Sequence, residues 1–130
     1  MLVDTDVLIW HLRGHSGAAA KLEEIGTFDI SVVTYMELVQ GMRSKEELRI
    51  MQAALPDWET RILMVSERIS LRAMSYVEQH FHSHALRLAD ALIAATAVEQ
   101  GASLLTGNAK HYSMITGLTL ETFRPEVDPA

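Results

Sequence analysis

The stretch Leu88-Ala-Asp-Ala-Leu-Ile-Ala-Ala-Thr-Ala-Val-Glu-Gln-Gly-Ala-Ser-Leu-Leu-Thr106 decides the fold. Residues 88–100 are rich in alanine, the best helix former, and Gly101 is a typical helix stop. Residues 102–106 form a short apolar run, which is typical of a buried strand. A helix that leads directly into a buried strand is part of a βαβ unit, so the stretch predicts an α/β fold with a parallel sheet.

The rest of the chain alternates in the same way between short apolar runs and helix-like segments. Further strands are predicted at residues 1–4, 28–33, 61–65 and 118–122, the last at an edge of the sheet. Helices are predicted at residues 7–12, 18–25, 34–42, 45–55 and 66–80, with a short one after Asn108. Pro56 is expected to close the helix at 45–55. The pattern predicts one α/β domain, residues 1–123, with helices on both faces of a parallel sheet of four to five strands, and a flexible tail at residues 124–130.

Composition narrows the class of protein. The 130 residues, of which 48% are hydrophobic, suffice for one compact domain with a real core. The formal net charge of −6 argues against broad affinity for polyanions, but not against a basic rim around an acidic pocket that holds a cation. The chain has no cysteine, and no apolar run reaches the roughly 18–20 residues that cross a bilayer. With no signal peptide evident, we expect a cytoplasmic protein that does not engage a membrane.

Oxygen-bearing side chains stand at four predicted junctions between strands and helices, namely Asp4, Glu37, Asp90 and Asn108. Each has a simple explanation as a helix cap or first-turn residue. Thr34 and Glu37 fit the S/T-x-x-E capping box, and the other three are residue types that stabilise helix N-termini. Taken singly, capping is the favoured explanation for each position.

Taken together, the same residues favour a metal site. The carboxyl ends of parallel strands meet at one edge of the sheet, which would bring Asp4, Glu37 and Asp90 together. Carboxylates packed side by side raise each other's pKa unless a cation lies between them. An oxygen-only ligand set favours Mg²⁺ or Mn²⁺ over zinc, and such a site favours phosphodiester chemistry.

Four segments carry a family resemblance: Leu2-Val-Asp-Thr-Asp6, Thr34-Tyr-Met-Glu-Leu-Val-Gln-Gly41, Leu88-Ala-Asp-Ala-Leu-Ile-Ala-Ala-Thr-Ala97 and Leu104-Leu-Thr-Gly-Asn-Ala-Lys-His-Tyr112. In this order they resemble the PIN domain and, more narrowly, the VapC-type toxins of toxin–antitoxin pairs. The similarity extends from Met1 to about Glu121, and the run 89–97 is its most specific part. The resemblance implies a three-layer α/β/α PIN-like fold.

The resemblance also implies a function and its residues. It implies a Mg²⁺-dependent endoribonuclease toxin that hydrolyses RNA, is neutralised by a cognate antitoxin, and assembles as a homodimer or a toxin–antitoxin hetero-oligomer. The three acids of the family fall on Asp4, Glu37 and Asp90. The fourth site, often Asp, holds Asn108, a neutral and weaker ligand. Thr106 matches a hydroxyl residue that supports the acidic cluster.

Two further residues are candidates for supporting roles. Asp6 stands two positions after the first acid and is expected to support the cluster rather than to hold the metal. Arg87 precedes Asp90 by one helical turn, where it is expected to pair with the cluster or contact the substrate. The run His80-Phe-His-Ser-His84 puts three histidines at alternate positions, but its place between two helices indicates a loop rather than a metal site.

Two other readings remain open at this point. The first is a catalytically degenerate PIN module that binds RNA or a protein without cleaving, which Asn108 and the acidic balance support. The second is a purely structural α/β domain in which the acids only cap helices. In the second case Asp4, Glu37 and Asp90 would lie far apart.

Overall fold

A computed structural model describes residues 1–83 and 85–125 of the chain. The strands are β1 (Leu2–Val3), β2 (Asp29–Ser31), β3 (Arg61–Leu63), β4 (Leu104–Thr106) and β5 (Leu120–Thr122). The helices are α1 (Thr5–Leu12), α2 (Ser16–Ile25), α3 (Val32–Gly41), α4 (Lys45–Asp57), α5 (Glu67–His80) and α6 (Leu88–Glu99), with the short 3₁₀ helix η1 (Ala109–His111). The α/β class and the order of elements agree with the sequence-based prediction.

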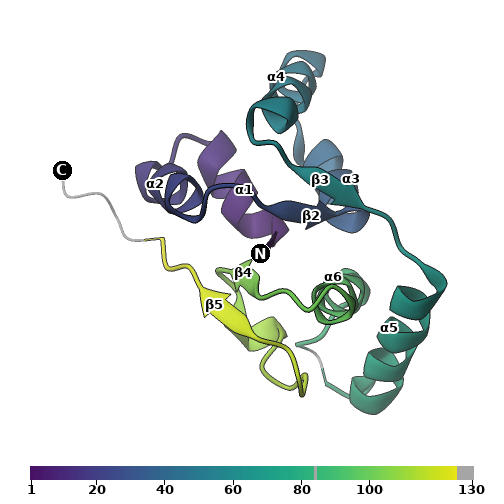
Figure 1. The fold of residues 1–130 in the computed structure, drawn as a ribbon. Helices are drawn as coiled ribbons and strands as arrows, with labels where there is room; N and C mark the ends of the chain where they lie inside the picture. Colours follow the sequence, from purple (N-terminus) through teal and green to yellow (C-terminus); the bar gives the residue numbers. More distant parts are fainter. Residues whose placement is uncertain (84, 126–130) are drawn as a thin grey trace.

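The five strands form one parallel sheet in the order β3-β2-β1-β4-β5 (Figure 1). The chain moves from β1 outward to β3, then returns to the other side of β1 as β4 and β5. The strand order therefore reverses between β1 and β4, which is where parallel sheets of this kind bind ligands. Val3 pairs in register with Leu105, so the residues that follow, Asp4 and Thr106, leave the sheet next to each other.

Alternating side chains divide the core between the two faces of the sheet. Leu2 and Leu104 pack with buried residues of α5 and α6, such as Ile93. Their neighbours Val3 and Leu105 pack on the opposite face with buried residues of α1 to α4. Because successive strand residues point to opposite faces, two-residue and three-residue strands suffice to join two helical layers into a three-layer fold. None of the helices in the described ranges combines the length and apolar character needed to cross a bilayer.

Several predicted boundaries are wrong, including the starts of α1 at Thr5 and of α2 at Ser16, and two of the errors have a clear physical cause. Helix α4 does not end at Leu55 but continues through Pro56 to Asp57, because a proline in the last turn removes only one helical hydrogen bond. Helix α3 begins at Val32, since the Ser31 hydroxyl accepts a hydrogen bond from the Val33 N–H and acts as the N-cap. The capping-box explanation of Thr34 and Glu37 is therefore also wrong. His84 and the tail residues 126–130 lie outside the described residues.

Candidate functional site at the carboxyl edge of the sheet

Asp4 is the centre of the site and is only 5% exposed. It follows β1 and caps α1, with its Oδ1 accepting a hydrogen bond of 2.8 Å from the Thr5 N–H. Its Oδ2 accepts bonds from two hydroxyls, those of Thr106 at 2.8 Å and Tyr112 at 2.9 Å. A capping role and a role in the site thus coexist on the two oxygens of one carboxylate.

The Tyr112 hydroxyl lies between the carboxylates of Asp4 and Asp90. Its Oδ1 is 3.4 Å from that hydroxyl, and its Oδ2 accepts a 3.0 Å bond from the Arg87 N–H at the start of α6. The His111 Nδ1 is 3.5 Å from the same Oδ2. Arg87 therefore contacts Asp90 through its backbone N–H. Within the described residues, the Arg87 side chain forms no ion pair with Asp90.

Glu37 joins the site through Thr5 rather than by direct contact with Asp4. Its Oε1 accepts a 2.7 Å bond from the Thr5 hydroxyl, which also lies 3.1 Å from the Thr34 hydroxyl. Since Thr5 directly follows Asp4, the carboxylate of Glu37 reaches the same edge of the sheet from α3. Glu37 and Asp90 are thus each linked to the Asp4 segment through a hydroxyl, that of Thr5 or that of Tyr112, rather than by direct contact with Asp4.

The segment after β4 closes the other side of the site. The Asp6 carboxylate accepts bonds from the Gly107 N–H at 2.8 Å and the Val7 N–H at 2.9 Å, which ties α1 to this segment. The Thr106 hydroxyl also accepts a 3.0 Å bond from the Asn108 N–H. The Asn108 side chain does not cap η1. Asp6 thus holds the backbone after β4, and Thr106 links that segment to Asp4.

Gly107 is required by the Asp6 contact. A Cβ at this position would lie 2.6 Å from Asp6 Oδ2, which is too close for both groups to keep their places. We expect Gly107→Ala to break the hydrogen bond to the Asp6 carboxylate and to lower the free energy of unfolding by about 2 kcal/mol, measured by urea denaturation. Gly41→Ala is the control, since its Cβ would meet only Ile9 Cδ1 at 3.4 Å. Equal stabilities of the two variants would contradict this account.

Burial and crowding work against the ionised forms of the acids. Burial raises the pKa of Asp4, and the charge of Asp90 adds to that rise, against the hydrogen bonds from Thr106 and Tyr112. Burial also raises the pKa of Asp90 and brings the pKa of Asp6 to about 6. The pKa of the Tyr112 hydroxyl is raised by burial and by the neighbouring Asp4. The site is therefore a place where negative charge is costly unless a cation is present.

Tyr112 holds two of the acids in place and is itself 1% exposed. We expect Tyr112→Phe to lower the free energy of unfolding by about 1.5–3 kcal/mol, because a hydrogen bond to a buried carboxylate is lost. Thermal and urea unfolding would measure the change. Tyr35→Phe is the control, because the Tyr35 hydroxyl accepts only an exposed bond from Gln52. A Tyr112→Phe protein as stable as the control variant would show that this hydroxyl does not support the site.

The residues fit a hard divalent cation in chemistry and charge. All three acids supply carboxylate oxygens, and the ion pairs found within residues 1–83 and 85–125 include no Lys or Arg partner for any of them. Their spacing is open: the described residues contain no group of three or more Asp, Glu or His side chains placed as metal ligands. Mg²⁺ usually keeps several waters and is bound through only one or two carboxylates, so a magnesium site does not require three carboxylates to converge.

Sequence reasoning missed three residues that the structure places in the site. Thr5 links Glu37 to the Asp4 segment, Tyr112 bridges Asp4 and Asp90, and His111 contacts Asp90. A signal for Thr5 was present, because its neighbours Asp4 and Asp6 were both candidates. For His111 and Tyr112 the only signal was their position shortly after Asn108.

Comparisons with known proteins agree with this geometry. The PIN domain family profile matches residues 1–115. Ribonuclease VapC10 of Mycobacterium tuberculosis is 38% identical over 122 residues, which cover 91% of this chain and 90% of the relative. Ribonuclease VapC19 of the same species is 32% identical over 124 residues, covering 90% and 95%.

Solved structures show the same fold. The toxin–antitoxin complex from Klebsiella pneumoniae contains a chain that superposes with a TM-score of 0.79 at 29% sequence identity, over 95% of this chain and 98% of that one. The resemblance inferred from the four sequence segments is confirmed. The chain belongs to the PIN-domain family and, within it, to the VapC group.

Proposed function

We propose that this chain is a Mg²⁺- or Mn²⁺-dependent endoribonuclease that acts as the toxin of a toxin–antitoxin pair. The observation that carries the proposal is the position of Asp4 and Asp90 on either side of the Tyr112 hydroxyl, at the point where the strand order reverses. Two relatives that span nearly the whole chain are named ribonucleases. The absence of cysteine suits the cytoplasm as the place of action.

Each residue of the acidic site has a distinct role in the proposed reaction. Asp4 and Asp90 would hold the metal ion, while Thr106 and Tyr112 fix the orientation of Asp4. Glu37, held by Thr5, would orient the attacking water and take its proton. A bound Mg²⁺ or Mn²⁺ supplies a Lewis acid that offsets the phosphate charge and makes water a better nucleophile near neutral pH.

The proposed reaction is the hydrolysis of an RNA phosphodiester bond. Water forms a new bond to phosphorus in line with the bond to the 3′ oxygen, which breaks. One proton leaves the water and one reaches the departing 3′ oxygen, so the products carry a 5′-phosphate and a 3′-hydroxyl. Asn108 would add a neutral oxygen near the site, which favours one tightly held metal over two.

A cleavage assay tests the proposal. Purified protein and a structured RNA should yield 5′-phosphorylated fragments in Mg²⁺ or Mn²⁺ and intact RNA in EDTA. Cleavage that persists in EDTA, or that is absent with every divalent ion, would overturn the proposal.

A second function, RNA or protein binding without cleavage, is favoured by the open spacing of the acids. Calorimetry separates the two. The ribonuclease should bind Mg²⁺ at the acidic site and lose that binding in Asp90→Asn. A module without catalysis should bind RNA equally well with and without the divalent ion.

The antitoxin partner is part of the same proposal. The Klebsiella pneumoniae structure is described as a toxin–antitoxin complex. An antitoxin segment that lays an Arg side chain against Asp4 and Asp90 would supply the missing positive charge through a charge-assisted hydrogen bond. Size-exclusion chromatography with light scattering of the co-expressed pair would separate a hetero-oligomer from a toxin homodimer.

A further inference from the structure

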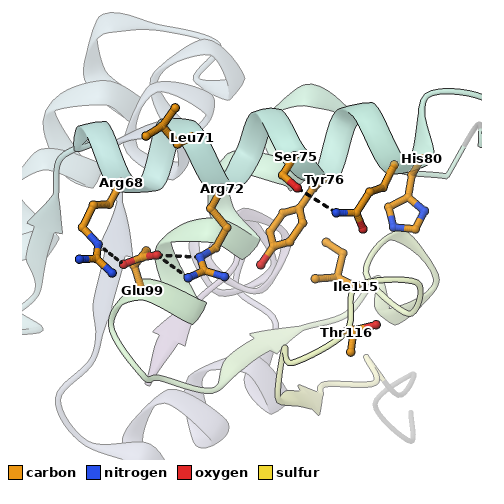
Figure 2. Close-up of a pocket in the computed structure, with 10 residues that line it drawn as sticks. Arg68, Leu71, Arg72, Ser75, Tyr76, His80, Glu99, Ile115 and Thr116 are labelled. Carbon is orange, nitrogen blue, oxygen red and sulfur yellow. Dashed lines mark hydrogen bonds and ion pairs between the residues drawn. The ribbon is translucent and has the colours of Figure 1, made fainter.

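A pocket of about 570 Å³ lies along α5 (Figure 2), and neither Asp4 nor Asp90 is among the residues that line it. Arg68 and Arg72 stand at one end, and both bond to Glu99 at the end of α6. Ile115 and the ring of Tyr76 form an apolar wall beside them. The pocket thus joins two cations to an apolar surface, in a chain whose formal net charge is −6.

The pocket has more hydrogen-bond donors than acceptors. A guanidinium carries five N–H donors; Arg68 uses one of these on Glu99 through Nε, and Arg72 uses two, through Nε and Nη2. Most donors of the pair therefore remain available, and the Arg68 side chain is 82% exposed. Glu99 is the acidic residue of the pocket, and its two oxygens already accept all three bonds. A ligand that completes this site has to be rich in acceptors and negatively charged.

The Tyr76 hydroxyl extends the cationic end of the pocket. The residue is only 7% exposed, and its oxygen points toward the Arg72 guanidinium (Figure 2) without forming a hydrogen bond of good geometry within the described residues. Glu99 first, and then the Tyr76 hydroxyl, raise the pKa of that guanidinium. A ligand oxygen between Tyr76 and Arg72 could accept a hydrogen bond from each of them with better geometry than they form with each other.

We propose that this pocket, formed by Arg68, Arg72 and Tyr76, binds a backbone phosphate of single-stranded RNA outside the acidic centre. The inference rests on the proposed ribonuclease function. Glu99 stands nine positions after Asp90 in α6, which is about 14 Å along the helix, a length that a few nucleotides can span. RNA phosphates are repelled by the carboxylates of the acidic site. A cationic contact elsewhere on the protein would offset this repulsion and help to hold the RNA. The apolar wall leaves room for the attached sugar.

RNA binding without cleavage tests the site. Fluorescence anisotropy of a labelled single-stranded RNA in EDTA would be measured for the full chain across a range of salt concentrations. Arg68→Gln should weaken binding about fivefold at low salt and reduce the slope of log affinity against log salt by about 0.7. Tyr76→Phe, which removes only the buried hydroxyl, should weaken binding about twofold. Inorganic phosphate should compete better than chloride at equal ionic strength.

Arg49→Gln is the matched control. Arg49 is 75% exposed and pairs with one carboxylate, Glu46, on α4, so its loss changes the net charge equally. Equal effects of the Arg68 and Arg49 variants would overturn the proposal, as would displacement of RNA by oligoglutamate but not by phosphate, which would indicate an acidic protein segment. The assay needs no cleavage. A protein that cleaves RNA but shows no Arg68 effect fails only this inference, and one that binds through Arg68 without cleaving fails only the proposed function.

Discussion

Asp4→Asn is expected to lower the rate of Mg²⁺-dependent RNA cleavage by about a thousandfold or more while the protein stays folded. The substitution removes one negative charge from the proposed metal site, and a metal's stabilisation of the transition state is worth several kcal/mol, of which about 4 kcal/mol is a thousandfold in rate. Stability should be maintained, because the charge of Asp4 is buried and lies beside Asp90. Cleavage rates and urea denaturation would be measured on the same preparations.

Asp57→Asn is the matched control for this experiment. Asp57 is an exposed residue at the end of α4, so the same chemical change occurs on the surface. The control should cleave RNA at the wild-type rate. Cleavage by Asp4→Asn at the control rate would show that Asp4 does not hold the metal. A large loss of stability in Asp4→Asn would show instead that its charge supports the fold.

Much of the fold could be predicted from sequence because it depends on local signals. The helix 88–100 and the strand after it follow from composition and from Gly101, and the observed α6 and β4 agree closely. The boundary between β2 and α3 could not be placed, because Ser31 and Thr34 are both acceptable caps and only the packed structure selects Ser31.

The site was predictable in outline for a topological reason. Residues that follow parallel strands must gather at one edge of the sheet, which brings Asp4 next to Thr106. The bridge through Tyr112 could not be predicted, since it joins residues 108 positions apart and depends on how the segment after η1 folds back. The spacing of the carboxylates also depends on side-chain packing, so a pattern of acids could not reveal that the cluster is open.

The metal-free protein is expected to lose stability as the pH rises from about 4 to 6. Burial, followed by the charge of Asp4, raises the pKa of Asp6 from 3.8 to about 6, and the pKa values of Asp4 and Asp90 are also raised. In this window the folded state binds more protons than the unfolded state, so the free energy of unfolding falls as the pH increases. Asp6 alone accounts for at most about 3 kcal/mol of this decrease.

The surface acids do not mask the effect. The pKa values of Asp29 and Glu99 are lowered, chiefly by hydrogen bonds from Arg61 and Arg72. Their stabilising contribution is complete above the unfolded pKa and is lost only as the pH falls below about 4. Burial lowers the pKa of His11, which makes the free energy of unfolding rise with pH near pH 6 and thus opposes the decrease. The difference between the wild type and Asp6→Asn, in which the His11 contribution cancels, therefore reports on the acidic site.

Urea denaturation in EDTA at several pH values between 4 and 7 would measure this dependence, with Asp6→Asn as the test variant and Asp57→Asn as the control. Asp6→Asn should flatten the curve, whereas the control should run parallel to the wild type. Saturating Mg²⁺ should reverse the trend, because a cation at one hundred times its dissociation constant adds about 2.7 kcal/mol to the free energy of unfolding. That gain should grow with pH, since the metal binds the ionised carboxylates. If the free energy of unfolding of the wild type does not change with pH in EDTA and does not increase in Mg²⁺, two claims are contradicted: that the acids at this edge destabilise the fold when ionised, and that a cation stabilises them.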